Sequence, residues 1–131
     1  MVIDTSALVA ILQNGPERRH FNEASEEAES CSISSATLVE TSRIIESRYG
    51  SLGLGALDLF ISKAGITMVP LDLDQAFIAR QAFSRYGNGR HPAGRNYGDC
   101  FSYALAKSVG QSLLQKGADF VRRDLTIYPA R

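Results

Sequence analysis

The chain opens with a short apolar run that ends abruptly at a carboxylate. Residues 1–3 are apolar, Asp4 follows, and a helical pattern of apolar residues begins just after Thr5 and Ser6. A buried strand that ends in an acidic residue places that carboxylate in the crevice where open α/β sheets bind ligands. We therefore expect the first strand to be the central strand of a sheet, and Asp4 to be the first ligand of a site.

The length and composition are those of one globular domain. The chain has 131 residues, 44% of them hydrophobic and 21% charged, and 14 basic residues balance 14 acidic ones. This length allows one substantial core, so we predict a single domain over residues 1–131. Because the net charge is zero, attraction to a nucleic acid would have to come from local patches of basic residues.

The cysteines and the amino terminus indicate the compartment. Cys31 and Cys100 lie in apolar surroundings, and a short disulfide scaffold would contain more cysteines, so we interpret both as reduced core residues. No apolar stretch approaches the length that spans a bilayer. The first residues lack the parts of a secretion signal. We expect a cytoplasmic protein with no membrane contact.

Short β-like runs alternate with longer helical patterns. The predicted strands cover residues 1–4, 31–33, 66–71, 112–115 and 124–128, and the predicted helices cover about 6–13, 16–29, 35–49, 52–64, 73–86 and 98–109, with a loop over 87–97 and a helical turn near 117–120. Helices between short strands imply right-handed crossovers. The pattern predicts a three-layer α/β/α fold with a small, mainly parallel central sheet.

Four acidic residues fall at the carboxyl ends of predicted strands or in the first turns of helices: Asp4, Glu40, Asp99 and Asp119. In a parallel sheet these places lie along one edge, so the four carboxylates could meet. Each also has a plainer interpretation. Asp4 could cap the first helix, and Glu40 could be a solvated helix residue. Asp99 could favour a helix N-terminus through the helix dipole, and Asp119 could be a turn residue.

The surroundings of two of these residues favour a metal site. Glu40 and Asp99 lie in weakly polar or aromatic stretches, where an unpaired carboxylate is costly. Clustered carboxylates repel one another unless a cation joins them, and ligands that are all oxygen select Mg²⁺ or Mn²⁺ over Zn²⁺. A water ionised by such a metal and steered by a carboxylate can attack a phosphodiester.

Other catalytic arrangements fit less well. The chain has no P-loop and no dinucleotide fingerprint. A phosphoacceptor signalling domain also uses acidic residues and a lysine, and Lys116 would suit it, but it needs adjacent acids after the first strand, where this chain has Asp4 and then Thr5. A haloacid-dehalogenase-like phosphatase needs a second Asp two positions after the first, where this chain has Ser6.

Five segments together resemble a known family over nearly the whole chain. They are residues 1–8 (MVIDTSAL), 34–40 (SSATLVE), 85–94 (RYGNGRHPAG), 96–106 (NYGDCFSYALA) and 113–120 (LLQKGADF). In their order and separation these segments resemble the PIN-domain ribonucleases, and within them the VapC-type toxins of bacterial toxin–antitoxin pairs.

The resemblance implies a Mg²⁺- or Mn²⁺-dependent endoribonuclease with an RNA substrate, usually a homodimer, held inactive by a VapB-type antitoxin. It implies that Asp4 and Asp99 are direct metal ligands, that Glu40 positions a water or the metal, and that Asp119 is a fourth acidic residue of the site. Thr5 or Ser6 would hydrogen-bond metal-bound water or phosphate.

One departure from the family pattern concerns the residue before Asp119. Many relatives carry an acidic or amide residue there, whereas this chain has Ala118. Asp124 is a candidate replacement, although a surface or capping role suits its position at a predicted strand start. Ala118 also motivates the alternative function, a catalytically weak PIN-like protein that only binds RNA or a partner.

Two further surfaces are candidates for contacts with other molecules. Arg90 and Arg95 in the loop over 87–97 could bind RNA phosphates, or they could simply be solvated. The apolar residues between Leu52 and Ile61 exceed what one packed helix face needs. In this family that surplus would serve a dimer contact or an antitoxin groove, and a helix buried on two sides is the plain alternative.

Overall fold

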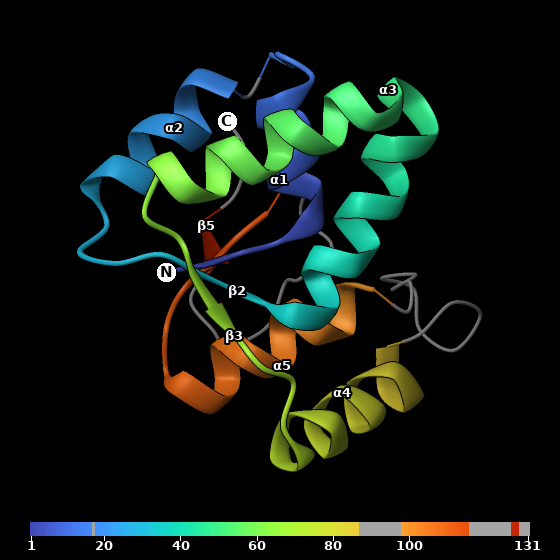
Figure 1. Ribbon diagram of the computed structural model, residues 1–131. Coiled ribbons are helices and arrows are strands. Elements are labelled where there is room, and N and C mark those ends of the chain that lie inside the picture. The colour runs from blue at the N-terminus through green and yellow to red at the C-terminus, as the bar shows by residue number, and fades with distance from the viewer. Residues whose placement is uncertain (17, 87–97, 116–126, 129–131) are drawn as a thin grey trace.

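The computed structural model describes residues 1–16, 18–86, 98–115 and 127–128. In chain order its elements are β1 (Val2–Ile3), α1 (Thr5–Leu12), α2 (Arg18–Glu27), β2 (Ser32–Ser34), α3 (Ser35–Lys63), β3 (Thr67–Val69), α4 (Leu73–Tyr86), α5 (Asp99–Val109), β4 (Leu113–Leu114) and β5 (Ile127–Tyr128) (Figure 1). The alternation of strands and helices follows the predicted order. The predicted loop over 87–97 and the predicted turn near 117–120 lie outside the described residues.

The five strands form one sheet in the order β3-β2-β1-β4-β5, and every pairing between neighbours is parallel. β1 therefore lies in the centre, as the sequence predicts. Val2 pairs with Ser32 of β2 on one side and with Leu113 of β4 on the other. Because all strands run in the same direction, their carboxyl ends meet at one edge of the sheet.

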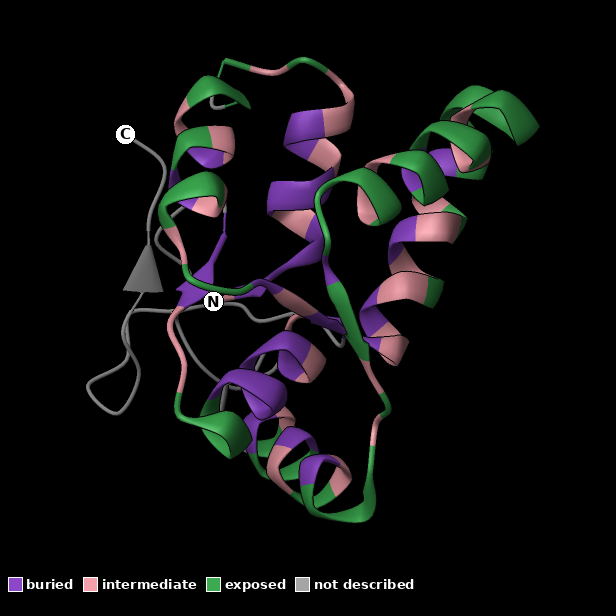
Figure 2. Ribbon diagram, turned by 60° about the vertical axis from the view of Figure 1, so that its left-hand side comes forward, coloured by how far each residue is buried: buried purple, intermediate pink, exposed green. Residues whose placement is uncertain are grey.

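Each face of the sheet is covered by its own hydrophobic core. Along β1 and β4, successive side chains point to opposite faces. Val2 and Leu113 pack into the core beneath α4 and α5, whereas Ile3 and Leu114 pack into the core beneath α1 and α2. α2 and α4 bury their inner faces and expose their outer faces, whereas α1 is buried or partly buried over its whole length (Figure 2). The predicted three-layer α/β/α architecture is confirmed.

The long helix α3 bends sharply at Gly50. This glycine has φ 68° and ψ −157°, outside the helical region, so α3 consists of two straight halves joined by a kink (Figure 1). Glycine adopts this conformation without the steric penalty that a side chain would add. The predicted break between helices near residue 50 is therefore present. Phe60 and Ile61 in the second half pack against the same core as Phe21 of α2.

The second half of α3 leaves apolar side chains uncovered. Leu57 is fully buried, but Leu52 is 89% exposed and Leu59 is 54% exposed. Leu52 also lines a surface groove with Leu12, Ile45, Tyr49, Gly53 and Ala56. The second half of α3 is therefore not buried on two sides within this single chain.

The predictions for the cysteines and for membrane-spanning helices can also be compared with the described residues. Cys31 and Cys100 are both buried and both free, in agreement with their interpretation as reduced core cysteines. Within the part of the chain that the structure describes, no helix combines the length and the apolar character needed to cross a lipid bilayer.

Candidate active site

Asp4 lies directly after the central strand and is 1% exposed. Its backbone N–H donates to the carbonyl of Leu114 on the neighbouring strand at 2.9 Å. Its side chain caps α1, because Oδ2 accepts hydrogen bonds from the Ser6 backbone N–H at 3.1 Å and from the Ser6 hydroxyl at 2.7 Å. Capping, the plainer interpretation of Asp4, is therefore correct, but it uses only one of the two carboxylate oxygens.

The second oxygen of Asp4 is buried without a hydrogen bond from any described residue. Burial raises the pKa of this carboxyl above its usual value of 3.8, and hydrogen bonds from Ser6 and Thr5 oppose that rise. The Ser102 hydroxyl also lies near enough to lower the pKa, although it does not reach hydrogen-bonding geometry with Oδ1. A buried carboxylate with one bare oxygen favours a cation at that oxygen.

Glu40 and Asp99 reach the same edge from two different helices. Glu40 lies in the second turn of α3, after β2, and Asp99 is the first residue of α5. Gly98, the N-cap residue of α5, is buried and has ordinary helical dihedral angles. A Cβ at Gly98 would overlap the Glu40 carboxylate, so the absent side chain is what lets Glu40 approach the start of α5.

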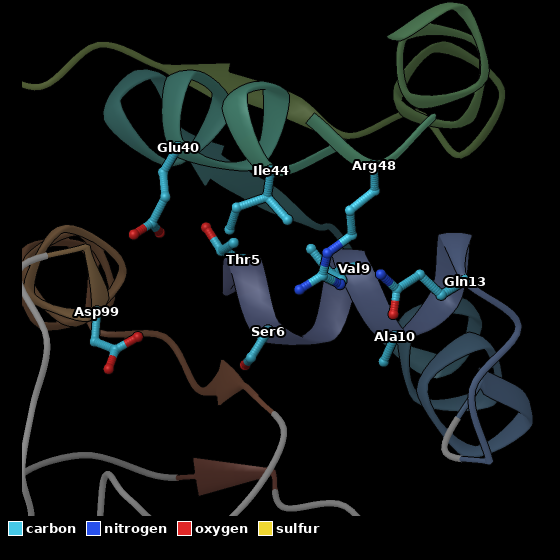
Figure 3. A pocket seen from close by; sticks show the side chains of 9 residues that line it. All are labelled: Thr5, Ser6, Val9, Ala10, Gln13, Glu40, Ile44, Arg48 and Asp99. Carbon is cyan, nitrogen blue, oxygen red and sulfur yellow. The ribbon is translucent and has the colours of Figure 1, made fainter. Parts of the chain in front are cut away.

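A cavity of about 300 Å³ lies between α1, α3 and the start of α5. Glu40 and Asp99 line one end of it, and Arg48 of α3 and Gln13 of α1 line the other (Figure 3). The remaining lining residues are Thr5, Ser6, Val9, Ala10 and Ile44. The cavity thus joins an acidic end, next to the buried Asp4, to a basic end.

Buried hydroxyl pairs fix the helices around this cavity. The Thr41 hydroxyl donates to the Thr5 hydroxyl at 3.0 Å, which ties α3 to the first residue of α1. The hydroxyls of Thr37 and Ser102 lie 3.1 Å apart and tie α3 to α5. Because buried hydroxyls without partners are costly, these pairs restrict how the three helices can shift relative to one another.

The described donors suit a divalent cation that retains water. Among the described residues, no three His, Cys, Asp or Glu side chains form a cluster that could hold a metal ion by themselves. Mg²⁺ commonly binds through one or two carboxylates and keeps several waters. The bare oxygen of Asp4 and the carboxylates of Glu40 and Asp99 are oxygen donors of the kind that Mg²⁺ and Mn²⁺ prefer. These residues therefore fit such an ion.

The predicted site residues include five that lie outside the described part of the chain and five that lie within it. Asp119, Arg90 and Arg95 lie outside the described residues, as do Ala118 and Asp124. Of the remaining predicted residues, Glu40, Asp99, Thr5 and Ser6 line one cavity, and Asp4 is buried beside it. The hydroxyls of Thr5 and Ser6 are both engaged in hydrogen bonds within the protein.

Three residues that shape this site are not among those predicted from the sequence. Arg48 follows Glu40 by eight residues on one helix, a spacing that keeps both on the same face and could have identified it. Gly98 directly precedes Asp99 and could have been recognised only through its contact with Glu40. Ser102 follows Asp99 by three residues and lies on the buried face of α5.

The pKa of Asp4 leads to a prediction for the metal-free protein. Since the folded state binds the Asp4 proton more tightly than the unfolded state, this residue lowers stability as the pH rises above about 3.8. Asp4→Asn removes this pH-dependent loss of stability. In a chelating buffer the variant should gain stability relative to wild type as the pH rises from 4 towards neutrality, because the wild-type protein loses the Asp4 proton over that range. Urea unfolding at several pH values measures this, and a stability difference that does not change with pH would contradict it.

Comparison with known proteins identifies the family. The family model described as PIN domain matches residues 1–125. The chain is 50% identical over 125 residues to ribonuclease VapC30 of Mycobacterium tuberculosis, with 95% of each chain covered. It is 51% identical over 125 residues to a ribonuclease VapC of Mycolicibacterium smegmatis, which covers 95% of this chain and 97% of the relative.

Solved structures share the fold at low sequence identity. VapBC2 from Rickettsia felis, bound to a DNA fragment from its promoter, has a chain with a TM-score of 0.76 and 15% identity, covering 99% of this chain and 98% of its own. VapC20 of Mycobacterium tuberculosis, described as a toxin that cleaves the sarcin-ricin loop, has a TM-score of 0.67 and 17% identity, covering 94% and 91%. The parallel sheet, the acidic residues at its carboxyl edge and the half-identical relatives lead to one conclusion: this chain belongs to the PIN domain family and, within it, to the VapC ribonucleases.

Proposed function

We propose that this protein is a Mg²⁺- or Mn²⁺-dependent endoribonuclease that acts as the toxin of a VapBC-type toxin–antitoxin pair. The observation that carries the proposal is the bare buried oxygen of Asp4 beside a cavity whose acidic end holds Glu40 and Asp99. Membership in the VapC ribonucleases supplies the reaction class, hydrolysis of RNA phosphodiester bonds. The acidic end supplies the donors that such a reaction needs.

The position of each site residue suggests its role in the proposed reaction. Asp4 Oδ1 and the Asp99 carboxylate would hold the ion, and Ser6 keeps Asp4 in one orientation by occupying its other oxygen. When bound, the ion would supply an ionised water and would stabilise the charge that develops on the phosphate. Glu40, whose carboxylate lies against Gly98, would orient a water and accept its proton. Asp119 is the proposed fourth acidic residue.

The direct test is cleavage of total cellular RNA by the purified protein. With added Mg²⁺ or Mn²⁺ we expect discrete fragments, and with a chelator we expect none. Asp99→Asn removes one proposed ligand and should lower the cleavage rate by about 100-fold or more while the protein stays folded. Intact RNA under all conditions, with folded protein free of antitoxin, would instead favour the alternative, a PIN-like protein that only binds RNA or a partner.

A second prediction concerns the space next to Glu40. Gly98→Ala should fold normally, because φ −66° and ψ −34° suit alanine, but the new Cβ should displace the Glu40 carboxylate. We expect about 10- to 100-fold slower cleavage and a smaller rise in melting temperature on adding Mn²⁺.

The control for this prediction is Gly55→Ala, because a Cβ at Gly55 has nothing within 4 Å. In the Glu40→Ala background, Gly98→Ala should have little additional effect, since the group that it displaces is already absent. If the two changes slowed cleavage independently, so that their factors multiplied, Gly98 would not act through Glu40.

The proposed partner is a VapB-type antitoxin, and the proposed assembly is a homodimer that joins it in a hetero-oligomer. Support comes from the uncovered apolar side chains of α3, since Leu52 and Tyr49 line a groove with Leu12 of α1. Exposed apolar patches of this kind mark sites of protein contact. The similar complex from Rickettsia felis contains both a VapB and a VapC protein.

The toxin role has its own test in living cells. Production of this chain in a bacterial host without an antitoxin should arrest growth, because uncontrolled RNA cleavage stops protein synthesis. Asp99→Asn, produced to the same level, should allow growth. Normal growth while active ribonuclease accumulates would argue against the toxin role and would leave the ribonuclease activity standing.

A further inference from the structure

The cavity beside the proposed catalytic residues is a trough between two helices. α3 contributes Glu40, Ile44 and Arg48, which are four residues apart and therefore lie on one face. α1 contributes Ser6, Val9, Ala10 and Gln13 from the facing side. Eight residues of helix separate Glu40 from Arg48, which corresponds to about 12 Å along the α3 axis. The trough therefore extends well beyond the acidic end, where the proposed catalytic residues lie.

Arg48 points into this trough, and no described residue neutralises it. Its side chain extends from α3 towards α1, over Val9 and beside Gln13 (Figure 3). Arg48 is exposed, and it forms no ion pair or hydrogen bond with the described residues. Among the described residues that line the trough, Arg48 alone carries a positive charge. Its guanidinium group is thus available to a ligand of the trough.

The chemistry of the trough matches a nucleic acid strand better than a small molecule. A guanidinium group binds phosphate through two parallel hydrogen bonds. An RNA strand carries a phosphate at every nucleotide, so a strand whose reacting phosphate lies at the acidic end continues past it. The apolar middle of the trough, formed by Val9, Ala10 and Ile44, separates the two charged ends.

We propose that Arg48 binds a phosphate of the RNA strand other than the one that reacts, and so holds the substrate along the trough. This inference rests on the proposed ribonuclease function and extends it, since it names a second contact point for the same substrate. Arg48 supplies affinity for the strand, while Asp4, Glu40 and Asp99 act at the reacting phosphate.

Binding to a nuclease-deficient protein tests the inference without cleavage. In the Asp99→Asn background, the affinity for a labelled single-stranded RNA of mixed sequence is measured by fluorescence anisotropy over a range of salt concentrations. Arg48→Gln should weaken binding about tenfold at low salt and reduce the slope of log affinity against log salt by about 0.7, the value for one phosphate contact on a single strand. Arg48→Lys keeps the charge and should keep the slope.

The matched control is Arg43→Gln. Arg43 lies on the same helix and is exposed, but it does not line the trough. Its replacement should leave both the affinity and the slope unchanged. All variants should melt at the temperature of the parent protein, because neither arginine contributes to the buried cores. Equal losses for Arg43→Gln and Arg48→Gln would overturn the inference, since they would indicate a diffuse effect of charge.

Cleavage kinetics in the otherwise native protein separate the possible failures. Arg48→Gln should raise KM about tenfold at unchanged kcat, as expected for a contact made equally in the ground state and the transition state. If the native protein cleaves RNA and Arg48→Gln matches it in KM and in salt slope, the Arg48 contact is wrong and the nuclease stands; Arg48 would then be free for an acidic group of a protein partner. If the native protein neither cleaves nor binds RNA, both proposals fail.

Discussion

The burial of one carboxylate at the end of the central strand is the constraint on which the site depends. β1 pairs on both sides, so Asp4 lies in the middle of the carboxyl edge of the sheet. Its side chain is buried there and does not reach solvent. The cost of this burial is reduced by two hydrogen bonds from Ser6 and by the start of α1, whose dipole favours negative charge. The second oxygen of Asp4 remains bare, and that oxygen is what favours a cation at this edge.

The helices around Asp4 carry the rest of the site because of how they pack against one another. The first half of α3 brings Glu40 to the acidic end and Arg48 to the basic end of the trough, and the kink at Gly50 turns the second half back over the core. The hydroxyl pairs Thr5–Thr41 and Thr37–Ser102 tie α3 to the helices on either side. One helix thus positions acidic, apolar and basic groups while its second half also packs against the core beneath α1 and α2.

The predictions that the structure confirms depended on local patterns. The apolar run at Val2 and Ile3 predicted a buried strand, and the glycine at position 50 predicted a break that is present as a kink. The roles of Asp4, Glu40 and Asp99 stay predictions. Each lies at the end of a strand or within the first two turns of a helix, and the structure brings Glu40 and Asp99 to one cavity with Asp4 buried beside it. Gly98 could not be predicted in the same way, because its role arises only where α5 meets a side chain of α3.

The sequence by itself determined the order of strands and helices, the parallel sheet with β1 at its centre, and the edge at which the acidic residues gather. Hydrophobic periodicity and short connections specify these features locally. Only the tertiary structure decided which oxygen of Asp4 stays bare, how closely Glu40 approaches Gly98, and that Arg48 faces the same trough as Glu40. These features depend on the distances and angles between packed helices, and residues far apart in the chain set those together.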